Sequence, residues 1–162
     1  MPSMSKAKKS ASKIFGIIEE KSEIDPREPG HQSDAQITQG AITLENVGFK
    51  YPSRRKRVLE NFNLTINGNE SVALVGHSGS GKSTIASLLL RFYNKQSGRI
   101  LIDGKELESY SVKQIRNQVA IVMQEPLLLN ESIKDNIRYG DPASSNARVL
   151  EVAGQANCLD FI

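Results

Sequence analysis

Residues 76–83 read Gly-His-Ser-Gly-Ser-Gly-Lys-Ser and fit the pattern G-x-x-x-x-G-K-[ST] at every defined position. The short apolar run 72–75 precedes this segment, and such a run is typical of a strand buried on both faces of a parallel sheet. Apolar residues at helical spacing follow over 83–93, at Ile85, Leu88, Leu89 and Phe92. The order of strand, glycine-rich loop and helix predicts an α/β fold built around this loop.

The same order suits a loop that binds phosphate. Glycine permits backbone conformations that a Cβ excludes, so successive N–H groups can converge on phosphate oxygens, and the helix dipole adds to their attraction. We expect Lys82 to reach the β- and γ-phosphates and the Ser83 hydroxyl to bind Mg²⁺. The alternative is a surface turn with an ordinary solvated lysine. The predicted phosphate-binding residues are Gly76, His77, Ser78, Gly79, Ser80, Gly81, Lys82, Ser83 and Thr84.

Length and composition limit the remaining classes of protein. The 162 residues are enough for one domain of ordinary size, and no stretch approaches the roughly 20 apolar residues of a membrane helix. The single cysteine, Cys158, excludes an internal disulfide, and we expect it to be a partly buried small side chain. The net charge is +3, but four lysines precede the first acid, Glu19, so the other residues sum to −1. This imbalance describes a basic tail and argues against a nucleic-acid-binding domain.

Periodicity predicts the other elements. Residues 5–20 form an amphipathic helix, for which a mitochondrial transit peptide is the alternative, although such peptides favour Arg and the first one is Arg27. A polar segment rich in Pro and Gly then leads to a fold that begins near Ala41. Alternation predicts strands at 42–49 and 62–66, and apolar runs predict strands at 99–103 and 119–123. Helices are expected to start at Ser111, at Ser132, and at Ser144 or Ser145.

Four segments in order resemble the nucleotide-binding domain of ATP-binding-cassette exporters of the P-glycoprotein type. They are 49–52, the glycine-rich loop, 122–126 and 132–140, and the resemblance covers nearly the whole chain. It implies a P-loop NTPase core of the ABC ATPase type, incomplete at the C-terminus, with an antiparallel β subdomain and the start of a helical subdomain. The implied parts are a helix continuing from a transmembrane domain at 1–22, a linker at 23–40 and the nucleotide-binding domain at 41–162. Within that domain the resemblance places the phosphate loop at 76–84, the Q-loop near 124 and the helical subdomain from 130 to 162.

The resemblance also implies roles for residues outside the loop. Tyr51 matches the aromatic residue that stacks on adenine, and Gln124 matches the glutamine that approaches Mg²⁺ and the attacking water. Ser83 and Gln124 are thus the implied metal ligands, and Lys82 and Gln124 contribute to a catalytic site that is not complete. The implied cofactors are ATP and Mg²⁺. Arg54 and Val58 are implied as weaker nucleotide contacts.

Two segments imitate functional motifs. Residues 100–103 carry the apolar run and acid of a Walker B strand, but Gly104 follows where a general-base carboxylate belongs, so we expect Asp103 to be structural. The basic run 54–57 could be a nuclear-localisation or nucleic-acid patch. It has no aromatic platform and no basic partners nearby, which favours a solvated loop between strands.

The sequence up to Ile162 contains no LSGGQ-type signature, no Walker B Asp-Glu pair and no switch histidine. Phosphoryl transfer needs a residue that orients the attacking water, so we expect the chain to bind MgATP without turning it over alone. By resemblance, its partners are a second nucleotide-binding domain and transmembrane domains, which would hold it on the cytosolic side of a membrane. Two alternatives remain. One is a non-catalytic nucleotide-binding or interaction module, and the other is an unrelated P-loop kinase, which would leave Tyr51, Gln124 and 132–140 unexplained.

Overall fold

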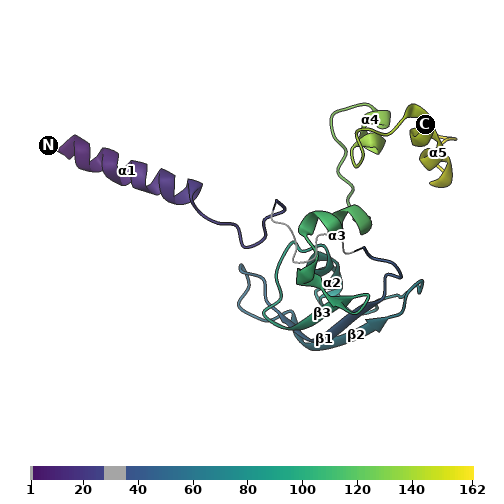
Figure 1. Ribbon diagram of the computed structural model, residues 1–162, viewed down its shortest axis with the longest axis horizontal. Helices are drawn as coiled ribbons and strands as arrows, with labels where there is room; N and C mark the ends of the chain where they lie inside the picture. The colour runs from purple at the N-terminus through teal and green to yellow at the C-terminus, as the bar shows by residue number, and fades with distance from the viewer. Residues whose placement is uncertain (1, 28–35) are drawn as a thin grey trace. The chain divides into compact units, whose positions relative to one another are not determined.

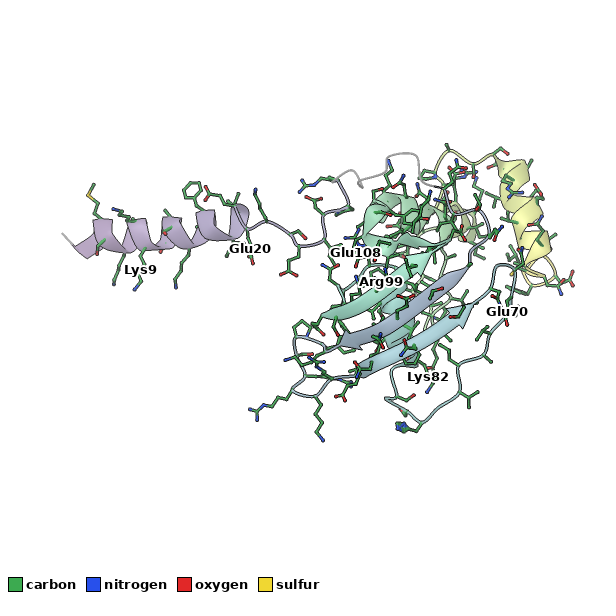
Figure 2. The ribbon with its side chains drawn as sticks, turned by 60° about the horizontal axis from the view of Figure 1, so that its bottom comes forward. Lys9, Glu20, Glu70, Lys82, Arg99 and Glu108 are labelled. Carbon is green, nitrogen blue, oxygen red and sulfur yellow. The ribbon has the colours of Figure 1, made fainter. Side chains whose placement is uncertain are left out.

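The computed structural model describes residues 2–27 and 36–162, which divide into two units, one ending at Ile121 and one spanning Val122–Ile162. The linker predicted at 23–40 therefore lies partly outside the described residues. The first described element is α1 (Pro2–Ile18), which agrees with the predicted amphipathic helix. Its described side chains, from Met4 to Ile18, are exposed (Figure 2). Among the residues that the structure describes, no helix has both the length and the apolar character needed to cross a membrane.

Four antiparallel strands form the sheet of the first unit, in the order β2-β1-β3-β4 (Figure 1). They are β1 (Ile42–Phe49), β2 (Leu59–Ile66), β3 (Ser97–Ile102) and β4 (Lys105–Glu106). Ile42 faces Ile66 of β2 on one side and Ile102 of β3 on the other. Alternation in the sequence thus correctly predicted β1 and the larger part of β2, and the apolar run correctly predicted β3.

The core lies between this sheet and two helices, α2 (Lys82–Leu89) and α3 (Val112–Gln118), on one of its faces (Figure 1). A 3-10 turn, η1 (Leu107–Ser109), connects β4 to the start of α3. Ser111 is the N-cap at which α3 begins, as predicted, and it forms a capping box with Gln114. Hydrophobic burial is the main term that holds these layers together. The buried cluster contains Leu44, Val47, Phe49, Leu59, Ile85, Leu88, Ile100, Ile102, Leu107, Tyr110 and Ile115.

Two predicted strands, 72–75 and 119–123, are not strands in the structure, and this corrects the sequence-based expectation. A parallel strand is stabilised by a hydrogen-bond ladder to its neighbours and by helices over both faces. Among residues 2–27 and 36–162, no strand pairs with either stretch. Most of their apolar side chains are accordingly exposed, up to 96% for Val75 and Val122, whereas Val119 packs against the core cluster.

The helix predicted over 83–93 is shorter than expected, since α2 ends at Leu89. Arg91 adopts a left-handed conformation with φ of 50°, and the N–H of Phe92 donates to the carbonyl of Ser87 at 2.9 Å. This closure satisfies a helix-end carbonyl and turns the chain away. Phe92 and Tyr93 therefore lie beyond the helix, although they continue its apolar spacing.

The second unit contains α4 (Ile133–Arg138) and α5 (Asn146–Gln155). Ser132 caps α4, as predicted, by accepting from the N–H of Asp135, and Ser145 caps α5 by accepting from the N–H of Arg148. Of the two starts considered for the last helix, Ser145 is thus the correct one. Cys158, expected to be partly buried, is half-buried just after α5.

Candidate functional site

The glycine-rich loop curves around the side chain of Lys82, which Figure 2 labels. The Lys82 Nζ donates to the carbonyl oxygens of Gly76 at 2.7 Å and His77 at 2.8 Å, and to the Ser80 Oγ at 3.3 Å. The N–H of Ser80 donates to the carbonyl of His77 at 3.2 Å, which closes a turn inside the loop. A single ammonium group is therefore held against the exposed main chain of residues 76–79, in the order that the motif predicted.

The backbone conformation at two positions of the loop explains why the motif needs glycine there. Gly79 and Gly81 have φ angles of 80° and 96°, in the left-handed region that residues with a side chain rarely adopt. A Cβ at Gly81 would also lie 2.9 Å from Leu59 Cδ2, so the loop packs tightly on β2 at this point. Gly81 is consequently fixed both by its backbone conformation and by its neighbour.

The loop leads directly into the N-terminus of α2. Gly81 is the N-cap and provides no side-chain cap, while its carbonyl accepts from the N–H groups of Thr84 and Ile85 at 3.0 and 3.2 Å. The first turn of a helix carries free N–H groups and partial positive charge, and both favour an anion. Ser83 is exposed in this turn, whereas Thr84 is buried. The charge, the helix end and an accessible hydroxyl thus converge beside one loop.

Tyr51 connects this region to the aromatic end of β1. Its hydroxyl lies 3.1 Å from the Thr84 Oγ1, within hydrogen-bond distance. Its ring packs edge-on against Phe49 and Tyr93, with centroids 4.8 and 5.0 Å away. The Arg54 guanidinium carbon lies 5.7 Å from the ring centroid. The structure therefore brings the Tyr51 ring next to the first turn of α2.

The weaker candidates, Val58 and the basic run 54–57, lie in different surroundings. Val58 lies against the loop, because a Cβ at Gly81 would be 3.2 Å from its Cγ1. The basic run 54–57 is exposed between β1 and β2, as the solvated-loop interpretation predicted. Tyr93 belongs to no motif and was not predicted at the site. Its only signal is its place after α2, which sequence spacing had assigned to the helix itself.

Gln124 is exposed in a bend of the second unit and follows the stretch expected to be a strand. The two units are described separately, so its role as a metal ligand and catalytic contributor stays a prediction. The predicted site residues that the structure brings together are Tyr51 and the loop residues 76–84. They all belong to the first unit.

Asp103 has the structural role predicted for it. Its carboxylate accepts hydrogen bonds from the backbone N–H groups of Thr38, Gln39 and Ala41 at 2.6, 3.1 and 2.9 Å. Burial disfavours the charge, but these hydrogen bonds outweigh it and lower the pKa of the carboxyl. The side chain thus fixes the segment that enters β1.

Comparison with known proteins gives one consistent result. A family model described as ABC transporter matches residues 59–161. "ABC transporter B family member 1" of Arabidopsis thaliana is 43% identical over 164 residues, which cover 100% of this chain and 13% of that protein. "P-glycoprotein 14" of Caenorhabditis elegans is 40% identical over 157 residues, covering 96% of this chain and 12% of that protein. This chain therefore spans about an eighth of the length of the curated relatives it matches.

A solved structure is similar over the same extent. The structure of a bacterial Atm1-family ABC exporter with ATP bound matches 93% of this chain and 26% of its own, with a TM-score of 0.81 and 35% sequence identity. The likeness includes both the sheet with its loop and the helices that follow, because so little of the chain is left out.

Proposed function

This chain belongs to the ABC transporter family, as part of the ATP-binding domain of an exporter-type member, and from this premise we propose that it binds MgATP through the loop at residues 76–84. The family assignment also confirms the predicted fold class, a partial P-loop ATPase domain with an antiparallel subdomain. In the complete transporter, binding and hydrolysis of ATP would drive a substrate across a membrane.

One observation carries the proposal: the ammonium group of Lys82 is bonded to the carbonyls of Gly76 and His77 at the start of the loop. These bonds hold a positive charge where the loop and the N-terminus of α2 meet. An anion at this place would receive the charge, the helix dipole and the loop N–H groups together.

The residues present fit both cofactors. Gly79 would have nothing within 4 Å of an added Cβ, so the loop is open at this position. Lys82 and Ser83 supply the charged donor and the hydroxyl that the motif requires. Mg²⁺, when bound, neutralises charge that develops on phosphate oxygens. Ser83 and Gln124 are the residues proposed to hold it. Lys82 binds the β- and γ-phosphates, and the Tyr51 ring supports the adenine.

Equilibrium dialysis of the 162-residue chain with MgATP tests this proposal. Lys82→Ala should abolish binding, and Tyr51→Ala should weaken it by about 1–3 kcal/mol, which is roughly 5- to 150-fold. Lys113→Ala is the matched control, since Lys113 is an exposed lysine on α3. Equal affinity of wild type and Lys82→Ala would contradict the proposal.

We expect the 162-residue chain to bind ATP without hydrolysing it. Its sequence contains no Asp-Glu pair and no LSGGQ-type segment to complete a catalytic site. Phosphate release from wild type should therefore equal release from Lys82→Ala. A rate clearly above that variant would show that a water-orienting residue is present among these residues after all.

The proposed partners are transmembrane domains and a second nucleotide-binding domain. The relatives carry names of whole transporters of which this chain spans about an eighth, which supports membrane-spanning partners and a position on the cytosolic side. Sequencing the transcript that encodes this chain is the direct test. A reading frame that includes membrane segments supports the proposal, whereas a frame limited to these residues contradicts it.

A further inference from the structure

The side chain of Tyr51 is held at its tip by one residue and at its ring by two others. The tip is the hydroxyl, 3.1 Å from Thr84 Oγ1. The ring lies edge-on to Phe49 and Tyr93 at interplanar angles of 82° and 89°. Three contacts from three parts of the fold therefore determine where this ring lies and how it is tilted.

The tip contact links Tyr51 to the phosphate loop. Thr84 directly follows Lys82 and Ser83 in the first turn of α2, and it is only 3% exposed. A buried hydroxyl that loses its partner is costly, so this contact resists breaking. This hydrogen bond thus ties the Tyr51 side chain to the start of α2, next to the loop.

The ring contacts fix the tilt. Phe49 is a buried core residue at the end of β1, whereas Tyr93 is 38% exposed and lies in the segment after α2. Phe49 and Tyr93 also pack on each other, with centroids 5.7 Å apart. The two edge-to-face contacts of the Tyr51 ring add to the stabilisation from simple area burial. Because Tyr93 is the less buried of the two, it can be changed without opening the core.

We propose that Tyr93 and Thr84 are positioning residues for Tyr51, which align the base platform with the phosphate loop. This inference rests on the proposed function, since it specifies how that site prefers a nucleoside triphosphate over triphosphate alone. A ring that is already fixed loses less conformational freedom when a base stacks on it. Neither residue needs to contact the base for this effect.

The experiment measures binding of two probes, MgATP and magnesium tripolyphosphate, to the 162-residue chain. The second probe lacks a base, so it reports on the phosphate loop alone. Tyr93→Leu should weaken MgATP binding roughly two- to tenfold, the range expected for loss of one aromatic pair, and leave tripolyphosphate binding unchanged. Tyr93→Phe keeps the ring and should bind both probes like wild type.

One further variant tests the hydrogen bond between the Tyr51 hydroxyl and Thr84. Tyr51→Phe retains the ring but removes the hydroxyl, and it should weaken MgATP binding by a few-fold, with tripolyphosphate unaffected. Tyr139→Leu is the matched control for Tyr93→Leu, because Tyr139 is an exposed tyrosine of the second unit. Circular dichroism of every variant shows whether the fold is retained.

A double variant separates positioning from a direct or global effect. In a Tyr51→Ala background, Tyr93→Leu should produce no additional loss of MgATP affinity, because the residue it positions is gone. Additional loss in that background, equal loss for both probes, or no loss for Tyr93→Leu would each overturn the inference.

Failure of the proposed function has a different signature. In that case wild type and Lys82→Ala bind both probes equally, and the inference falls together with its premise. If binding depends on Lys82 but the ratio of the two affinities does not depend on Tyr93, the inference alone is wrong.

Discussion

Two apolar runs of similar composition behave in opposite ways in this molecule. Residues 100–102 lie in β3, paired with β1 on one side and β4 on the other, and Ile100 and Ile102 are almost fully buried. Residues 72–75 pair with no strand among the described residues, and Val75 is 96% exposed. Apolar composition therefore makes a stretch able to form a strand, but partners decide whether it does so.

The largest expected effect concerns the backbone. Amides of β1 should exchange hydrogen more slowly than amides of 72–75 and 119–123, by on the order of a thousandfold, because exchange from a paired strand needs unfolding of the sheet. Hydrogen exchange followed by mass spectrometry measures this difference. Comparable protection of both classes would mean that the unpaired stretches are structured in solution.

Side-chain truncation should give the next largest difference. Ile100→Ala leaves a cavity in the core and should lower the free energy of unfolding by about 2–5 kcal/mol. Val75→Ala should change it by less than about 0.5 kcal/mol, since its side chain is already exposed. Urea unfolding followed by near-ultraviolet circular dichroism reports on the first unit, which holds three of the four tyrosines. A similar loss of unfolding free energy in Ile100→Ala and Val75→Ala would contradict the difference between the paired and the unpaired run.

A smaller effect is expected at the end of β3, where Asp103 accepts from the backbone before β1. Asp103→Asn places a donor group where an acceptor is needed and should lower the free energy of unfolding by about 1–2 kcal/mol at neutral pH. The folded-state pKa of Asp103 lies below its ordinary value of 3.8. This stabilisation is therefore complete above that value and is lost as the pH falls through the folded pKa.

The difference in the free energy of unfolding between wild type and Asp103→Asn should accordingly become smaller as the pH falls below 3.8, the ordinary pKa of aspartate. Urea unfolding at neutral and acidic pH measures it. A gap that stays constant would assign the effect to packing and not to the charge.

The smallest effect should come from removing the N-cap of α3, a helix of the first unit. Ser111→Ala removes the cap of α3 and should lower the free energy of unfolding of the first unit by about 1 kcal/mol. Ser132→Ala, which removes the cap of α4, should leave the unfolding of the first unit unchanged, because α4 belongs to the second. A loss of similar size for both would indicate that the units unfold together.

Much of the fold could be predicted from local patterns. Strands 42–49 and 62–66 follow from alternation and 99–103 from its apolar run. The caps at Ser111, Ser132 and Ser145 follow from side chains that satisfy helix N–H groups. The same logic failed at 72–75 and 119–123, because a parallel strand depends on residues distant in sequence. It also placed the end of α2 too late, since the left-handed backbone at Arg91 has no side-chain signature.

The candidate site was predicted in part. The loop and its relation to α2 follow from the motif, because glycines, lysine and serine at this spacing have a defined physical task. Tyr51 required the family resemblance, since a tyrosine after a strand is ordinary in itself. Tyr93 could not be found at all, because its edge-on contact with Tyr51 depends on how the chain turns after α2.

The tight packing of Gly81 on Leu59 affects how variants found in a genetic screen should be interpreted. Any replacement at this position disturbs both the backbone of the loop and the neighbouring strand, so a defective allele there reveals little about which property was lost. Alleles that change Lys82 remove its hydrogen bonds to the loop but leave the left-handed backbone of Gly81 and its packing on Leu59 in place, so they say more about binding of the anion.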